Sequence, residues 1–360
     1  MVRNLWLVLA AMLVVSSGMI IPHLGKLKGH TPRTYAVQID DPPEVRWAPM
    51  AHDYKHALDL FMAEFELIPI PKKFYKFIDW WAHNVFVHQD FVREIDALAK
   101  ISGYPFGEIF FLNFMYEFST IKACSTILVK SAGKVLHGRN LDFPMMRLLS
   151  SLVVTVDYYE GHKKVFTIDH VLGSVFALTG IRYGAFAVNV DTRYTTSNVA
   201  ELVNIFVDDA MPDVWLLRRV LAEETNYADA LQRLKTTRIG APVYFMISGV
   251  KDNEGCVIER DCNAVHASYE LNDVNWFLVQ TNYDRDQPDP IIDPRRGAVE
   301  NRLKEQGKAG FTEKILFEDF MTEWPTMNIG TIMTAIMTPA TGYHNSTVWY
   351  KSNPSASSIV

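Results

Sequence analysis

KACSTILVKSAGKVLHGRNLDFP, residues 122–144, marks the point where the chain changes from helical to β-type patterns. Cys124 stands directly before an apolar run typical of a strand, and a second run ends on Arg139 and Asp142. A Gly-containing turn separates the two runs, so we expect a hairpin that turns at Ser131-Ala132-Gly133. Such a hairpin would gather a thiol and charged side chains at one end of a sheet.

The register of this hairpin follows from its turn. Pairing Lys130 with Lys134 places Asn140 opposite Cys124 and puts Asp142 on the same face, one diagonal step away. Arg139 would then join this group only at a bulge or where the pairing ends.

Activation of the thiol needs a charged neighbour and a base. A free cysteine has a pKa of about 8.5, and the guanidinium of Arg139 would favour the thiolate. The only nearby histidine is His137, and its spacing does not predict a Cys-His pair, although a thiol protease with His137 as base is one alternative. A second possibility is the amine of Cys124 itself, freed by a cut after Ala123.

Asp142 would orient that amine by a hydrogen bond. Against both catalytic hypotheses stands a structural one, in which Cys124 is a small buried apolar residue and Arg139 with Asp142 forms a surface ion pair. Composition and spacing alone leave these alternatives open.

The chain of 360 residues is 49% hydrophobic and 21% charged, which is typical of a globular protein. Its net charge of −6 and scattered basic residues argue against nucleic-acid binding.

The first 18 residues, MVRNLWLVLAAMLVVSSG, have the plan of a secretory signal peptide, with an apolar run shorter than a membrane-spanning helix needs. The sequon Asn345-Ser346-Thr347 predicts glycosylation at Asn345.

Patterns along the chain divide it at Ala123-Cys124, where no Pro/Gly/Ser linker intervenes. The N-terminal third predicts a short strand in TYAVQ, ended by Pro42-Pro43, and then helices over Tyr54–Glu66, Phe74–Phe86, Phe91–Ile101 and Gly107–Phe118. Beyond Cys124 we expect strands in STILV, KVLHG, SLVVTVDYY, KVFTID, GAFAVNV, VYFMISG, CVIER and WFLVQT, with helices over Pro212–Val220 and Asn226–Leu234. One compact body of sheets layered with helices follows from this order.

Three stretches carry a resemblance to a known family. CSTILV and HGRNLDFP resemble the Cys-Thr-Ser-Ile and His-Gly-Arg-Asn-Leu-Asp motifs of the acid ceramidase and N-acylethanolamine-hydrolysing acid amidase family, whose members are N-terminal nucleophile hydrolases akin to bile-acid and penicillin amidases. IDDPPEVRW (39–47) looks like the opening motif of the family's α chain. VQTNYDRDQPDPIIDPRRGAVENRL (279–303) looks like its distal active-site segment. The resemblance covers residues 35–350.

This resemblance implies an α+β fold, a four-layer αββα sandwich. It implies a precursor that cuts itself between Ala123 and Cys124 into a helical α chain and a catalytic β chain (124–360). With the signal peptide expected over residues 1–18, the α chain would span residues 19–123.

The resemblance also assigns the site. Cys124 would be the nucleophile, Arg139 would steer it and Asp142 would hold its amine. Asn282, in Thr-Asn-Tyr-Asp, would donate to the oxyanion, and Arg295, in Asp-Pro-Arg-Arg, would complete the cluster.

Three departures from the family pattern stand out. The family shows Asp/Asn-Glu-Arg where this chain has Asp191-Thr192-Arg193, so Thr192 replaces a glutamate of the site and puts processing in doubt if that carboxylate matters. The loop from Cys124 to Arg139 is about one residue shorter than the family's, which a surface hairpin tolerates. The hydroxyl pair Ser125-Thr126 is in reversed order.

The implied activity is hydrolysis of a long-chain amide, with an N-acylethanolamine favoured over ceramide because the tail has no further cysteines. A non-processed lipid-binding relative is the competing class. Phe143, Met145 and Met146 would line the acyl slot, although a Met pair is also common in a core. The family implies a lysosomal address, and no cofactor is implied, since His-Glu-x-x-His and other metal-ligand spacings are missing from the sequence.

PKKFYKFIDWWAHNVF interleaves lysines with Phe74, Phe77, Trp80 and Trp81, as an interfacial amphipathic helix does. The alternative is that this face packs against the β chain, and burial distinguishes the two.

Overall fold

The structure is a computed structural model that describes residues 27–65, 70–114, 124–143, 146–193 and 198–351. Before Cys124, its elements are β1 (Leu27–His30), β2 (Thr34–Gln38), α2 (Pro43–Asp53), α3 (Lys55–Phe65), α4 (Lys72–Asn84), α5 (Gln89–Ser102) and α6 (Phe106–Leu112). The predicted strand and four predicted helices are present. Helix α2 was not predicted, because Pro43, which was taken only as the end of a strand, also starts a helix at its first turn.

The part that follows Cys124 is rich in strands. Its strands are β3 (Ser125–Ser131), β4 (Lys134–Asp142), β5 (Val153–Glu160), β6 (Lys163–Val171), β7 (Thr179–Arg182), β8 (Phe186–Thr192), β9 (Val243–Gly249), β10 (Gly255–Arg260), β11 (Val265–Glu270), β12 (Phe277–Gln280), β13 (Thr331–Thr338) and β14 (Tyr343–Lys351). Its helices are α7 (Met146–Leu149), η1 (Ser150–Leu152), α8 (Asn198–Phe206), α9 (Asp213–Glu223), α10 (Tyr227–Thr236), α11 (Arg295–Gln306), α12 (Glu313–Ile315) and η2 (Leu316–Met321).

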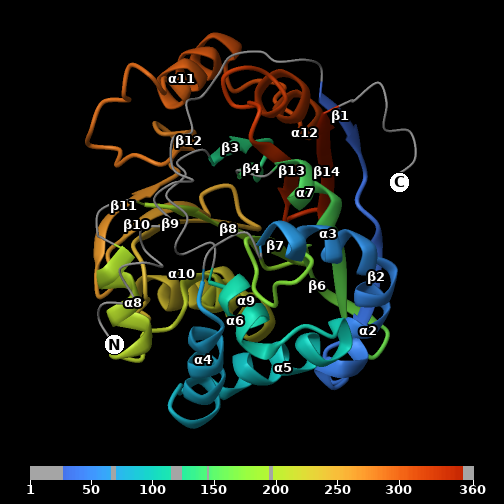
Figure 1. Cartoon of the computed structure of the whole chain (residues 1–360). Helices are drawn as coiled ribbons and strands as arrows, with labels where there is room; N and C mark the ends of the chain where they lie inside the picture. Colours follow the sequence, from blue (N-terminus) through green and yellow to red (C-terminus); the bar gives the residue numbers. More distant parts are fainter. Residues whose placement is uncertain (1–26, 66–69, 115–123, 144–145, 194–197, 352–360) are drawn as a thin grey trace.

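Two sheets form the middle of the molecule. Within the described residues, the first has the strand order β1-β14-β13-β4-β3-β12 and the second the order β11-β10-β9-β8-β7-β6-β5-β2. In Figure 1, α11 and α12 lie beyond the first sheet, whereas α9, α10 and the N-terminal helices α4 to α6 lie beyond the second. This is the expected αββα arrangement, and the N-terminal part adds one edge strand to each sheet.

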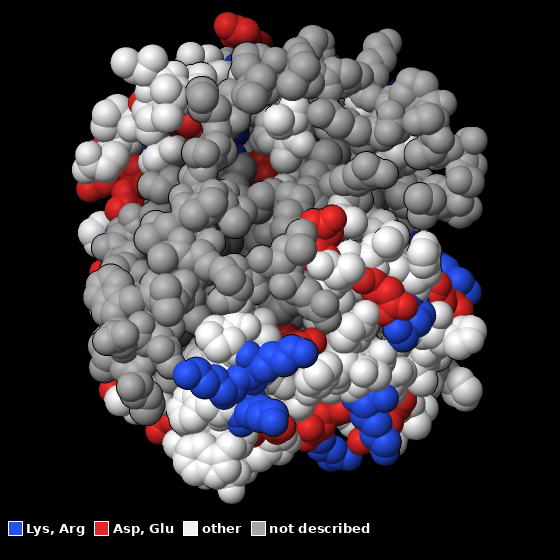
Figure 2. Space-filling model, viewed as in Figure 1, with Lys and Arg blue, Asp and Glu red and all other residues white. Residues whose placement is uncertain are grey.

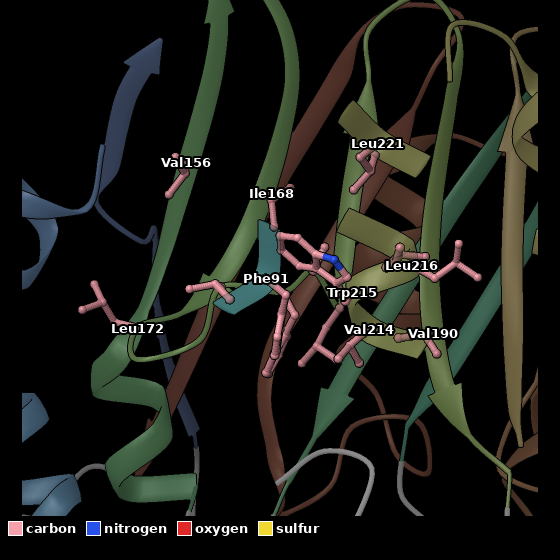
Figure 3. Packing of buried hydrophobic residues seen from close by; sticks show 14 of the residues in the cluster. Phe91, Val156, Ile168, Leu172, Val190, Val214, Trp215, Leu216 and Leu221 are labelled. Atoms are coloured by element: carbon pink, nitrogen blue, oxygen red, sulfur yellow. The ribbon is translucent and has the colours of Figure 1, made fainter. Parts of the chain in front are cut away.

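The core extends on both sides of the second sheet because most of its strands are buried on both faces. Figure 3 shows Phe91 of α5 next to Trp215 of α9, among apolar side chains of the second sheet such as Ile168 and Val190. Their ring centroids are 5.0 Å apart in an edge-on contact. The N-terminal helices are therefore an integral layer of the fold rather than an appended domain.

Burial resolves the two interpretations of α4. Trp80 is 57% exposed and Phe77 is also exposed, but Trp81 is 5% exposed and packs in the core, where Phe74 also makes contact. The predicted membrane contact is therefore wrong for Trp81, whose ring packs inward, whereas Phe74 is half-buried against the core. Basic side chains gather over α4 in the view of Figure 2. No helix among those described is long and apolar enough to cross a bilayer.

Candidate active site

The β3–β4 hairpin sets the position of the thiol. It turns at Ala132-Gly133, both with positive φ (47° and 78°), which makes the turn one residue shorter than expected. The predicted register is therefore wrong by one residue, and Asn140 pairs with Ser125 rather than facing Cys124. Since side chains alternate along a strand, Arg139 points to the Cys124 face without needing a bulge.

Arg295 connects the predicted site residues. Its guanidinium lies at the start of α11, is completely buried and donates to the carbonyl oxygen of Cys124 at 2.7 Å and to Asn282 Oδ1 at 3.2 Å. A fork of two hydrogen bonds to the carboxylate of Asp293, at 2.6 and 2.7 Å, fixes its orientation. The Nη1 atom of Arg295, which donates to the Cys124 carbonyl, is also 3.8 Å from Asp142 Oδ2. Residues 171 positions apart thus meet at one point.

Asp142 ends β4 and is buried beside Arg295. Its Oδ2 accepts a hydrogen bond from Asn328 Nδ2 at 2.5 Å, while Oδ1 has no hydrogen-bond partner among the described residues. Burial raises the pKa of this carboxyl to about 7, although the charge of Arg295 acts in the opposite direction. Asp142 can therefore change its protonation state near neutral pH and offers a free oxygen to a new partner.

Residues of β8 in the second sheet hold the Arg139 side chain in place. Its Nη2 donates to the carbonyl of Val190 at 2.9 Å and lies 3.5 Å from Asp191 Oδ1, with both side chains fully buried. Burial raises the pKa of Asp191 to about 6, against the opposing charge of Arg139. Asp191 is a site residue that sequence reasoning missed, although it stands next to Thr192 in the motif already quoted.

The thiol of Cys124 is neutral in the uncut chain. Burial raises its pKa to about 11, and the lowering effect of Arg139 is smaller than this desolvation. Arg139 acts to favour the thiolate, but in this state desolvation outweighs its charge. Activation needs a further positive charge at the sulfur.

His137 is not placed to act as the base. Its Nε2 donates to Asn189 Oδ1 at 2.7 Å and its Nδ1 accepts from the hydroxyl of Ser248 at 3.0 Å, so both ring nitrogens are occupied. Burial lowers its pKa to about 4. This histidine is a buried polar link between the sheets, and the thiol protease alternative is not supported.

Asn282 and Thr192 are in direct contact. The side-chain amide of Asn282 donates from Nδ2 to the backbone carbonyl of Thr192 at 3.0 Å. Asn282 therefore lies between the end of β8 and Arg295. The guanidinium of Arg295 donates to Asn282 Oδ1. The Thr192 side chain is not needed for this contact because only its backbone takes part.

Comparison with known proteins gives consistent results. A family model described as the beta subunit of N-acylethanolamine-hydrolyzing acid amidase matches residues 30–88. An N-acylethanolamine-hydrolyzing acid amidase of Caenorhabditis elegans is 30% identical over 89% of this chain and 93% of its own length. The acid ceramidase of Mus musculus is 29% identical over 87% of this chain and 85% of its own. The chain belongs to the family of these acid amidases and acid ceramidases.

A solved structure supports the fold of the family member described here. The Caenorhabditis elegans N-acylethanolamine-hydrolyzing acid amidase ortholog superposes with a TM-score of 0.55 at 30% identity, covering 60% of this chain and 93% of that one. The four-layer arrangement predicted from the sequence is thus confirmed, and the family assignment made from its motifs is confirmed with it.

An apolar cavity of about 40 Å³ lies next to the site. Phe143 and Leu141 line it from the end of β4, and further apolar side chains complete the wall, among them Phe61, Leu112, Phe176 and Ile332. Phe143 therefore lines an apolar cavity, and its role in substrate binding stays a prediction. Met145 lies outside the described residues, and so does the side chain of Met146 at the start of α7.

The other predicted sites fall elsewhere. Ala123 lies outside the described residues, as do residues 1–18. Asn345 is half-buried on β14, where it pairs with Ile336, and its glycosylation stays a prediction. Glu259, His266 and Asp284 bring ligand atoms within 4.8 Å of one another, but Asp284 is already paired with the cation of Arg193, which disfavours a metal ion.

Proposed function

We propose that the chain is a cysteine amidohydrolase of the N-terminal nucleophile type that hydrolyses N-acylethanolamines to a fatty acid and ethanolamine. The relatives named for this reaction support the substrate, since they match along nearly their whole length. The observation that carries the proposal is the contact set of Arg295, which ties Cys124 to Asn282 beside Asp142. Nucleophile, oxyanion donor and amine-binding carboxyl thereby share one buried point.

The first step of the proposed mechanism is self-cleavage after Ala123. The Cys124 sulfur attacks the carbonyl carbon of residue 123, the C–N bond breaks as the nitrogen takes up a proton, and water hydrolyses the thioester. The new α-amine has an ordinary pKa of about 7.7–8.0 and is protonated at acid pH. Its positive charge beside the sulfur lowers the thiol pKa, which burial holds near 11 before the cut.

Amide hydrolysis then uses the same groups. The Cys124 thiolate attacks the acyl carbonyl, and Asn282 Nδ2 donates to the oxyanion. The α-ammonium of Cys124 protonates the leaving ethanolamine nitrogen, and water hydrolyses the acyl thioester to the free fatty acid. Asp142 accepts a hydrogen bond from the α-amine through Oδ1, which has no hydrogen-bond partner among the described residues.

The cavity lined by Phe143 and Leu141 is the proposed entrance to the acyl-chain slot, because its wall is almost wholly apolar and begins next to the hairpin that carries Cys124. The exposed Phe77 and Trp80 of α4, close to its lysines, are the proposed contact with a lipid surface. A lysosomal location by way of the secretory pathway belongs to the same proposal.

Ceramide is the second candidate substrate, because acid ceramidases match this chain at nearly the same identity as the acylethanolamine amidases. A non-processed lipid-binding protein is the third. Thr192 was the residue that favoured it, but the intact contacts of Cys124, Arg139, Asp142 and Arg295 favour an enzyme.

The test combines processing with substrate comparison. The purified chain is incubated at acidic pH beside Cys124→Ser and the matched control Cys256→Ser, whose thiol is also buried. We expect a new chain that begins at Cys124 in the wild type and control only, seen by intact mass and N-terminal sequencing. Processed protein is then given an N-acylethanolamine and a ceramide with the same acyl chain. An uncut wild type would contradict the mechanism. Faster hydrolysis of the ceramide would make ceramide the first candidate substrate and the N-acylethanolamine the second.

A further inference from the structure

Arg193 follows Thr192 at the end of β8, and its side chain is 2% exposed. Its Nε and Nη2 form a fork with the two carboxylate oxygens of Asp284, at 2.6 and 2.8 Å. The third nitrogen, Nη1, donates to Asp261 at 2.6 Å. A buried forked pair of this kind is geometrically demanding, because lysine cannot reproduce both parallel hydrogen bonds.

The pair joins the segment that carries Asn282 to the end of β8. Thr192 and Arg193 are consecutive on one segment, while Asn282 and Asp284 are two residues apart on the other. One link is the Asn282 to Thr192 carbonyl contact of 3.0 Å, and the second is the Arg193–Asp284 fork. The charged fork is the stronger of these two links, while Arg295 contacts the same amide directly by donating to Asn282 Oδ1 at 3.2 Å.

We infer that Arg193 and Asp284 form a positioning pair that holds the Asn282 amide at the place where it stabilises the oxyanion. The inference rests on the proposed function, since that function assigns the oxyanion contact to Asn282. Neither residue touches the reacting atoms, so both act through Asn282 alone.

The surroundings allow this role at acid pH. Asp284 also accepts a hydrogen bond from the hydroxyl of Tyr244 at 2.8 Å, and His266 Nε2 lies 3.9 Å from it. Burial acts to raise the pKa of Asp284, but the hydrogen bonds from Arg193 and Tyr244 outweigh it and lower that pKa. The carboxylate therefore stays ionised, and the fork persists, under the conditions in which an acid amidase works.

A further arginine, Arg296, also holds the loop that carries Asp284. Arg296 donates from Nη1 to the backbone carbonyl of Asp284 at 3.0 Å, and its Nη2 donates to the carbonyl of Gln287. Loss of the Arg193 fork should therefore displace the Asn282 amide rather than unfold the segment.

The kinetic test uses Arg193→Lys, which keeps the charge but not the fork, and Asp284→Asn, which keeps the shape. The control is Arg238→Lys, whose exposed pair with Asp208 lies on the surface. We expect kcat for acylethanolamine hydrolysis to fall by about 10- to 100-fold in both variants with KM changed by less than about 3-fold, because a whole oxyanion donor is typically worth about 10²–10³ in kcat. The control should keep its kcat.

A double-mutant cycle with Asn282→Ala tests whether Arg193 affects kcat through Asn282. If Arg193 acts through Asn282, Arg193→Lys has little further effect once Asn282 is alanine. Independent, multiplying losses would overturn the inference, and so would an unchanged kcat in Arg193→Lys and Asp284→Asn.

Crystal structures of Cys124→Ala with and without Arg193→Lys separate this inference from the proposed function. We expect the Asn282 Nδ2 to Thr192 oxygen distance to exceed hydrogen-bonding range in the double variant. An unchanged contact overturns the positioning role whatever the substrate. A wild type that hydrolyses no acyl amide overturns the proposed function, while the displaced amide still supports the positioning pair.

Discussion

At the scale of single residues, the site is a set of charges removed from water. Arg139, Arg295 and Asp142 are at most 2% exposed, and Cys124 lies among them. Desolvation therefore competes with each pairwise attraction, and it prevails at the thiol and at both Asp142 and Asp191. Sequence motifs name these residues, but they do not reveal which effect is larger, because burial is a property of the folded chain.

Asp142 should give self-cleavage its pH dependence. With a pKa of about 7 in the uncut chain, the carboxyl is protonated below neutral pH and ionised above it. A protonated Asp142 can donate to the leaving nitrogen of Cys124, so cleavage should quicken as the pH falls from about 8 to about 5. Asp142→Asn should slow cleavage at the acid end by about 10²-fold or more and flatten the profile. The measurement is the rate of appearance of the new chain by gel at each pH. The same pH profile in Asp142→Asn would exclude this role.

Asn282 should affect the rate rather than binding. Replacing it with alanine removes the amide that the proposed mechanism places on the oxyanion, while Arg295 keeps its fork to Asp293. In processed protein, kcat should fall by about 10²–10³ with little change in KM. A matched control is Asn204→Ala, since this half-buried amide donates to the Gly240 carbonyl away from the site. A rise in KM at constant kcat would instead make Asn282 a substrate-binding residue.

At the scale of elements, the β3–β4 hairpin shows how one residue in a turn changes a site. The two-residue turn at Ala132-Gly133 brings Arg139 to the Cys124 face, whereas the longer turn expected from the sequence would have placed Asn140 there. Period and composition predicted both strands correctly because their apolar runs are long. The turn was harder to predict, since Ala132 has a positive φ that alanine seldom adopts.

This turn offers a test on stability. Asparagine tolerates positive φ better than alanine, and Asn-Gly is the preferred pair in such turns. Ala132→Asn should therefore raise the free energy of unfolding by about 0.5–1 kcal/mol without changing cleavage or activity. Urea unfolding of the uncut Cys124→Ala protein, with and without the change, gives the difference. A loss of stability would show that Ala132 is not under backbone strain.

At the scale of the whole molecule, polar groups connect the two sheets across their interface. His344 of β14 belongs to the first sheet, and its Nε2 lies 3.0 Å from Asp169 Oδ2 of β6 in the second. Ser346 also donates to Asp169 Oδ2, at 2.6 Å. Burial acts to lower the pKa of His344, but the charge of Asp169 outweighs it and raises that pKa. The pair thus favours the charged form of His344.

This pair should stabilise the fold more strongly in acid. A histidine whose pKa is raised by folding adds stability below its unfolded pKa of about 6.5 and loses it as the pH rises through the folded value. His344→Gln should therefore lower the free energy of unfolding by about 1–3 kcal/mol near pH 5.5 and by less near pH 8.5. Thermal unfolding of uncut protein at both pH values tests this, with the exposed His162→Gln as control. An equal loss at both pH values would contradict a charged His344.

The sequence by itself determined the family through its local motifs, and with it the αββα fold that the resemblance implied. The same motifs predicted Cys124, Arg139, Asp142, Asn282 and Arg295 as site residues. Only the tertiary structure decided how they act. Partners such as Asn328 for Asp142 are 186 residues apart in the chain, and local patterns carry no information about such contacts. The inward rotation of Trp81, the register of the hairpin and the neutral thiol likewise depend on packing and desolvation, which arise only when distant segments come together.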